Sequence, residues 1–152
     1  MRTCLAAALV AAALAGPAAA RAPFAGGEGC YWRSYGAAHL AAHPAQQVTT
    51  MRLEAWSDPA AAGRQVLRLT VTVRGGAERP AATAYCEATG GGVLACDLEG
   101  DAGSFAAGPA PGGAVRLRVG DDGLVFEGAR GFVELSGRAG DDRVFLLRPG
   151  CP

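Results

Sequence analysis

The chain of 152 residues contains no lysine, no isoleucine and no asparagine, and it has only two histidines. All 14 residues with a permanent positive charge are therefore arginines, and 14 acidic residues balance them. A chain without a positive excess offers little to hold nucleic acid or an anionic membrane surface, so we expect neither as a partner. The absent residue types, together with abundant alanine and glycine, are typical of a GC-rich bacterial genome.

The sequence also lacks the motifs that mark several enzyme classes. It contains no P-loop, no G-x-G-x-x-G after a strand, no G-x-S-x-G around a serine, no HExxH and no EF-hand loop. The absence of these motifs excludes the nucleotide-binding, serine-hydrolase and zinc-protease mechanisms that depend on them. We therefore expect a protein that is not an enzyme and that needs no cofactor.

Long hydrophobic runs are scarce, and the only one stands at the start of the chain. An apolar run over residues 5–15 follows a positive start at Arg2 and precedes a small-x-small cleavage sequence that ends at Ala20. The run is shorter than the roughly 20 residues that a membrane-spanning helix needs. We expect residues 1–20 to be a signal peptide and residues 21–152 to be a single β-domain in the periplasm or outside the cell, with no membrane span.

Cleavage of the signal peptide leaves four cysteines, an even number that favours disulfides in an exported protein. If the three glycines of "CEATGGGVLAC" form a hairpin loop, Cys86 lies directly opposite Cys96, within disulfide range. The spacing is not the CxxC of common metal and redox sites. By elimination Cys30 pairs with Cys151, although the sequence alone leaves two other connectivities possible.

Alternating apolar and polar residues predict an all-β fold. The turn-rich sequences "GDDG", "GARG" and "RAGDD" separate several of the segments. We expect an antiparallel barrel or sandwich of about eight short strands, held by disulfides, with one short N-terminal helix within residues 34–46. The expected strands include residues 48–56, 64–75, 103–108, 114–119, 123–128, 132–137 and 143–148, besides the two strands of the cysteine hairpin.

Three segments together resemble a family of small exported proteins from alphaproteobacteria. They are "YGAAHLAAHPAQQVTTMRL", the cysteine hairpin followed by "DLEGDAGSF", and the ending "DDRVFLLRPGC". The resemblance spans most of the mature chain and implies export, but it brings no established activity. The chain departs from the pattern at Gly36, where the family has an acidic residue, and at Gly100 and Arg138, where it has cysteines. The paired change is consistent with the loss of a third disulfide.

Two pairs of residues are candidates for binding. His39 and His43 are spaced i, i+4, so on a helix they face the same way and could share a metal with an acidic third ligand. The alternative is a pair of histidines that cap, pack or form hydrogen bonds, and we assign no metal ligand. Glu99 and Asp101 directly follow the cysteine hairpin and lie within the resembled motif, although hairpin turns favour acidic residues for conformational reasons alone.

These observations favour a non-enzymatic, inhibitor-like binding module. A periplasmic protein or an envelope component is the expected partner, and the loop after Cys96 is the segment expected to enter a partner's cleft. One alternative is a metal-binding protein or enzyme that uses His39 and His43. Another is a structural component of the envelope.

Overall fold

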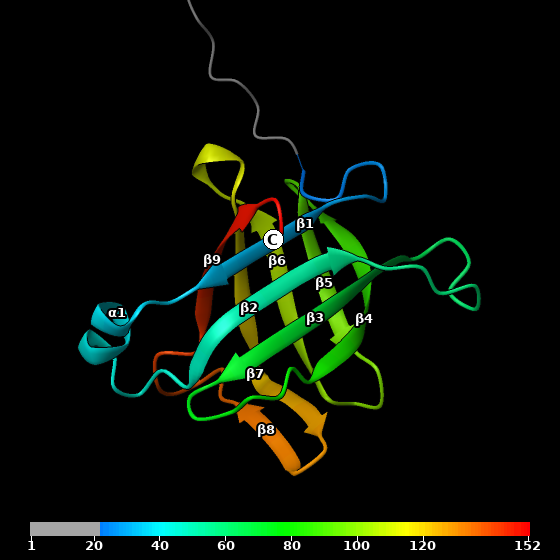
Figure 1. Cartoon of the computed structure of the whole chain (residues 1–152). Coiled ribbons are helices and arrows are strands. Elements are labelled where there is room, and N and C mark those ends of the chain that lie inside the picture. The colour runs from blue at the N-terminus through cyan, green and yellow to red at the C-terminus, as the bar shows by residue number, and fades with distance from the viewer. Residues whose placement is uncertain (1–21) are drawn as a thin grey trace, which may run out of the picture.

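The computed structural model describes residues 22–152, which form one antiparallel sheet rolled into a barrel (Figure 1). The expected signal peptide, residues 1–20, lies outside the described residues. In chain order the elements are β1 (Cys30–Ser34), α1 (Ala37–Ala42), β2 (Val48–Ala55), β3 (Gln65–Val73), β4 (Ala81–Gly90), β5 (Val93–Leu98), β6 (Gly103–Pro109), the short 3-10 helix η1 (Pro111–Gly113), β7 (Val115–Gly128), β8 (Gly131–Leu135) and β9 (Val144–Pro149).

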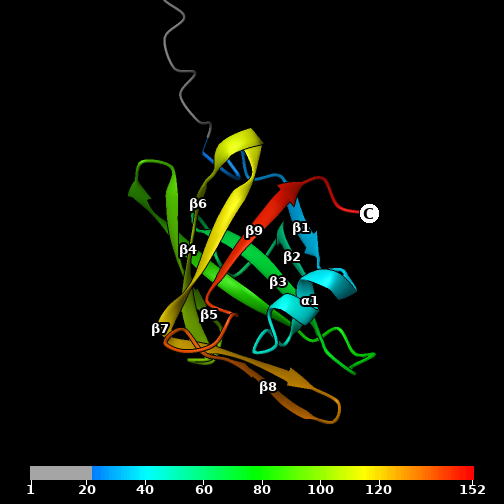
Figure 2. The same ribbon diagram turned by 90° about the vertical axis from the view of Figure 1, so that its left-hand side faces the viewer.

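The barrel closes because β9 returns between the first and the seventh strand. Strands β1 to β7 pair in chain order, and β9 then pairs with both β7 and β1 (Figure 2). Strand β8 pairs with β7 alone and forms a hairpin at one end of the barrel (Figure 1). The prediction of an all-β antiparallel fold with one short helix is confirmed, and the architecture is a barrel of eight strands with one extra strand.

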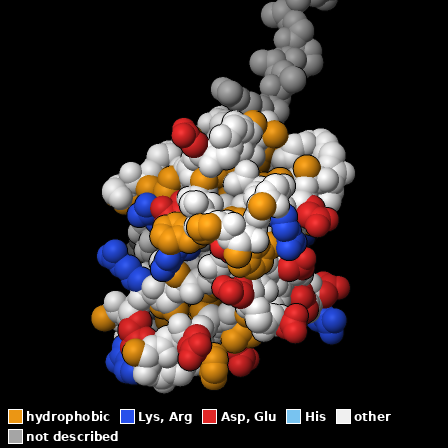
Figure 3. Space-filling model, turned by 90° about the vertical axis from the view of Figure 1, so that its right-hand side faces the viewer, with side chains coloured by type: hydrophobic (Ala, Val, Ile, Leu, Met, Phe, Trp, Pro, Cys, Tyr) orange, Lys and Arg blue, Asp and Glu red, His pale blue; other side chains and the backbone are white. Residues whose placement is uncertain are grey.

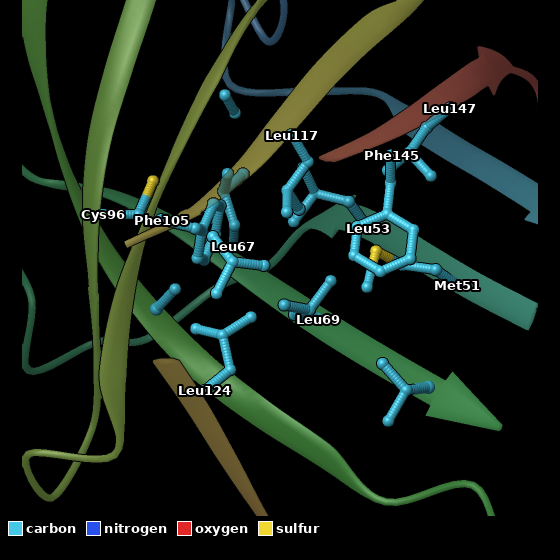
Figure 4. Close-up of a cluster of buried hydrophobic side chains, with 14 of the residues drawn as sticks. Met51, Leu53, Leu67, Leu69, Cys96, Phe105, Leu117, Leu124, Phe145 and Leu147 are labelled. Carbon is cyan, nitrogen blue, oxygen red and sulfur yellow. The ribbon is translucent and has the colours of Figure 1, made fainter. Parts of the chain in front are cut away.

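The barrel interior is filled by side chains from alternate positions of the strands, as expected for a barrel of this size. Leu67, Leu69 and Val71 of β3 point inward, whereas Arg68 and Thr70 between them are only partly buried. Figure 4 shows the apolar cluster that results. Its largest fully buried side chains are Phe126, Phe145, Met51, Leu53, Leu67, Leu69, Leu117, Leu124, Leu135 and Leu147.

Strand β7 differs from the prediction. The sequence predicts two strands, over residues 114–119 and 123–128, joined by a "GDDG" turn, and this prediction is wrong. A single strand runs through both segments, and its register with β6 shifts after Val119. Gly123, at φ +80°, supports the resulting bulge because a residue without Cβ adopts this conformation without strain. Turn-forming residues thus bend the strand without ending it.

Both disulfides have the predicted connectivity. Cys30 bonds Cys151 with Cα atoms 5.7 Å apart, and Cys86 bonds Cys96 with Cα atoms 4.1 Å apart. In the hairpin Cys86 pairs directly with Cys96, as the sequence predicts, but a bulge makes Gly90 the partner of Val93. The first bond ties the start of β1 to the chain end, and the second lies inside the barrel wall.

The predicted helix is present as α1, a helix of six residues that leaves the barrel between β1 and β2. Arg74 holds its C-terminal end: the guanidinium donates to the carbonyl oxygens of Leu40 at 2.6 Å, His43 at 2.9 Å and Gln46 at 2.6 Å. Within residues 22–152 no helix has the length and apolar character that crossing a membrane requires.

Candidate functional site

The first candidate pair, His39 and His43, lies beside a pocket between α1, β7 and the loop before β9. The imidazole of His39 stacks on that of His43, with ring centroids 4.4 Å apart, and on the ring of Tyr35 at 4.6 Å. Burial raises the pKa of the Tyr35 phenol, so this ring stays neutral at physiological pH. The three rings form one continuous stack at the wall of the pocket.

The pocket has a volume of about 420 Å³ and a mixed charge. Arg118, Arg143, Asp121 and Asp141 line it together with the histidines. Next to it lies the buried Asp142, whose carboxylate accepts hydrogen bonds from the backbone N–H groups of residues 47 and 48. Asp142 therefore joins the loop before β9 to the start of β2, next to the pocket.

The nitrogens of the histidine pair point to different partners. Nε2 of His39 lies 2.9 Å from Oε1 of Gln46, and Nδ1 of His43 lies 3.9 Å from a carboxylate oxygen of Asp141. In the part of the chain that the structure describes, no three or more His, Cys, Asp or Glu side chains come together as a metal site. His39 thus stacks on His43 and lies within hydrogen-bond distance of Gln46, whereas the contact of His43 with Asp141 is longer.

The second candidate pair, Glu99 and Asp101, lies in a different place, the turn between β5 and β6. This turn lines a groove of about 490 Å³, which we call the acidic groove. Its floor consists of small or aliphatic residues, and its opposite wall comes from the β7–β8 hairpin. The residues that define it are Ala81, Ala82, Thr83, Glu99, Gly100, Asp101, Ala102, Val125, Glu127 and Phe132.

The acidic groove carries charge of one sign beside an exposed aromatic ring. Phe132 is 69% exposed, and its direct cross-strand partner is Glu127. Among the described residues no basic side chain forms an ion pair with Glu99, Asp101 or Glu127. Figure 3 views the molecule from the right-hand side of Figure 1; acidic and hydrophobic side chains lie side by side in the lower half of that face, and arginines appear at its edges.

Local contacts hold both walls of the groove. The backbone N–H of Val125 donates to the carbonyl oxygen of Ala102 at 2.8 Å, which joins β7 to the β5–β6 turn. At the hairpin tip the carboxylate of Glu78 accepts hydrogen bonds from the N–H of Ala129 at 3.0 Å and from Nε of Arg130 at 2.7 Å. The groove is thus a preformed feature of the barrel end.

The structure separates the two candidate pairs. His39 and His43 line the pocket beside α1, whereas Glu99 and Asp101 line the acidic groove, so they do not share one cleft. Sequence reasoning missed Phe132 and Glu127. The alternation in "FVELSG" was a usable signal. Residues three apart on a strand point to opposite faces, so an inward Leu135 places Phe132 on the solvent-facing side.

The chain matches no family model, and neither the curated proteins nor the solved structures include one with significant similarity to it. The functional argument therefore depends on the geometry of the described residues.

Proposed function

We propose that the chain is an exported, non-enzymatic binding module, inhibitor-like in build, that captures a cationic side chain of a periplasmic protein in the acidic groove. Support for export comes from two disulfides, which persist in oxidising compartments, and from the signal-like start of the sequence. The similarity in build to inhibitors concerns size and fold type alone.

One observation carries the proposal: an aromatic ring that is 69% exposed stands in a groove with three carboxylates and no basic lining residue. An arginine or lysine of a partner that lies over the face of Phe132 gains a cation–π contact. The same head group then reaches Glu127 and Glu99, which offer charge-assisted hydrogen bonds. An aromatic anchor with acidic neighbours is the kind of feature that dominates binding energy at interfaces.

The packed interior supports a binding site on the outside of the barrel. Barrels that carry a ligand inside leave a central cavity, whereas here apolar side chains from the strands fill the centre. The candidate sites that the structure offers are accordingly surface features.

The geometry favours a partner side chain that enters the groove, and not a loop of this chain that enters a cleft of the partner. The turn after Cys96 has only four residues between β5 and β6, from Glu99 to Ala102, so it is too short to reach into a deep cleft. The turn forms a wall instead, and we propose that a projecting side chain of the partner enters the groove.

The test compares groove variants with matched variants elsewhere on the barrel. Immobilised full-length protein, with its disulfides formed, is exposed to a periplasmic extract and, in a titration, to a lysozyme as a defined cationic probe. We expect binding that Phe132→Ser and Glu127→Gln each weaken about tenfold or more. Trp56→Ser, at a side chain 45% exposed, and Glu87→Gln, at an exposed acid on β4, should leave binding unchanged.

Different outcomes favour the alternative functions. Equal binding by all four variants would contradict the proposal. Stoichiometric zinc or copper that survives dialysis and is lost on His39→Ala would support the metal-binding alternative. No partner and no metal would favour a structural role in the envelope.

A further inference from the structure

A second surface feature lies on the outer face of the barrel, over β6. It is a trough of about 360 Å³ between β5 and β7. Its floor holds Ala106 and Gly108, and Arg116 and Arg118 of β7 form one wall. Val93 of β5 belongs to the other wall. We call this feature the β6 trough.

The two arginines project to the same side because β7 alternates. Val115, Leu117 and Val119 are buried, so Arg116 and Arg118 both face solvent. Their cross-strand partners on β6 are Gly108 and Ala106. Residues two apart on a strand are separated by about 6.6 to 6.8 Å. The two arginines therefore have the same spacing as alternate residues of an extended peptide.

Neither Arg116 nor Arg118 forms an ion pair within the described part of the chain. The ion pairs found there involve Arg52, Arg64, Arg130 and His43. The formal charge of the whole chain is balanced, and Arg118 also lines the pocket beside α1, together with Asp121 and Asp141. The lining of the β6 trough contains two arginines and no acid.

Small residues keep the floor of the β6 trough open. A Cβ added at Gly108 would lie 3.1 Å from a methyl group of Val93, so even alanine would narrow the space between the walls. An extended backbone can therefore lie edgewise over β6. In that position its alternate side chains point to the arginine wall and to the apolar wall.

We propose that the β6 trough binds an extended segment of a protein partner in which acidic side chains alternate with aliphatic ones. Carboxylates two residues apart match Arg116 and Arg118, which can hold them through charge-assisted and bidentate hydrogen bonds. The intervening aliphatic side chains pack against Val93. This site is independent of the acidic groove, since the two features share no lining residue.

The probe is a blocked hexapeptide of alternating glutamate and valine, titrated into the full-length oxidised protein and followed by fluorescence anisotropy. We expect saturable binding that weakens as salt increases. The double variant Arg116→Gln/Arg118→Gln should weaken it about tenfold or more, because both charge-assisted contacts are lost. Ala106→Phe should do the same without changing charge, since the new ring fills the floor.

Two control variants show whether peptide binding is specific to the β6 trough. Arg79→Gln removes an exposed arginine in the β3–β4 loop, and Phe132→Ser alters the acidic groove; both should bind the peptide as the wild type does. Circular dichroism melting curves verify that each variant is folded. A peptide in which glutamine replaces glutamate should not bind.

Three results would overturn the proposal. The first is peptide affinity that the double arginine variant leaves unchanged. The second is no binding of the peptide by the wild type. The third is arginine-dependent binding to phosphatidylglycerol vesicles without binding of the peptide, which would assign the surface to an anionic lipid.

Discussion

Glycines decide the geometry where β6, β7 and β8 meet. Gly103, at φ +105°, lies against the backbone of Gly123, and a Cβ on it would overlap the carbonyl oxygen there. The close approach allows β7 to pass from the barrel wall into the β7–β8 hairpin. The acidic groove depends on this approach because its two walls meet at this point.

Gly103→Ala is expected to destabilise the fold strongly. The added methyl group is incompatible with both the positive φ and the neighbouring carbonyl, so we expect a cost of about 2 kcal/mol or more in the free energy of unfolding. Gly112→Ala is the matched control, because Gly112 has a positive φ of +71° and open space around it. Its expected cost is about 1 kcal/mol. Urea denaturation measures both, and equal costs would contradict the steric argument.

Asp142 is a second residue whose environment gives a measurable effect. It is 3% exposed, and its carboxylate accepts the N–H of Gln47 at 2.6 Å and the N–H of Val48 at 3.1 Å. Burial raises the pKa of Asp142 above its ordinary value of 3.8, and the two backbone hydrogen bonds oppose this only in part. The folded protein therefore binds a proton at the Asp142 carboxylate more tightly than the unfolded chain does.

Asp142→Asn removes the titration and one acceptor oxygen. We expect a loss of about 1 to 3 kcal/mol, because one backbone N–H stays buried without a partner. The advantage of the wild type over the variant should be largest below pH 3.8 and should fall as pH rises through the raised pKa. Urea denaturation across this pH range tests the sign. An advantage that grows with pH would contradict it, and Asp122→Asn, at an exposed site, is the control.

At the scale of single elements, the β4–β5 hairpin follows directly from its sequence. Glycines at the tip and cysteines at matching distances from it fix both the turn and the register. The disulfide crosses between paired positions on the inner face of the barrel, where both cysteines are buried.

Replacement of Cys86 and Cys96 together by alanine is expected to cost about 2 to 3 kcal/mol, because the bond restricts a loop of only 10 residues in the unfolded chain. The register of the hairpin should survive, since backbone pairing on both sides of β4 and β5 remains. Urea denaturation gives the cost, and amide hydrogen exchange shows whether the pairing persists. An unchanged stability would contradict the prediction.

Strand β7 shows that the local sequence of a segment does not by itself decide where a strand ends. Its "GDDG" sequence is typical of a hairpin turn, yet the strand continues because β6 and β9 hold the first half and β8 pairs with the second. Strand β1 was not predicted, because its residues Cys30–Ser34 follow a glycine-rich start and become a strand through pairing with β2 and β9. Partners in space outweighed local sequence in both cases.

At the scale of the whole molecule, closure depends on the two ends of the described chain. Strands β1 and β9 pair through few residues, Tyr31 with Pro149 and Trp32 with Arg148. The Cys30–Cys151 bond lies next to this short pairing and joins positions 121 residues apart. The bond therefore stabilises the β1–β9 seam, where β9 has fewer paired residues than it has with β7.

Loss of the seam disulfide is expected to cost more than loss of the hairpin disulfide. In the chain-entropy model a loop of 121 residues corresponds to about 5 kcal/mol. We expect Cys30→Ala/Cys151→Ala to lower the melting temperature further than Cys86→Ala/Cys96→Ala, with exchange of β9 amides accelerated. A larger effect of the hairpin pair would show that strain or residual structure, and not loop size, governs these bonds.

The sequence by itself determined the antiparallel all-β fold, the inward faces of strands such as β3, the helix near His39 and the pairing of Cys86 with Cys96. Each depends on neighbours close in the chain, where side-chain alternation and turn residues act directly. Tertiary structure decided the closure into a barrel, the single bent β7, and the separation of His39 from Glu99 and Asp101. It also placed Phe132 beside the carboxylates, because long-range strand pairing sets which distant loops meet.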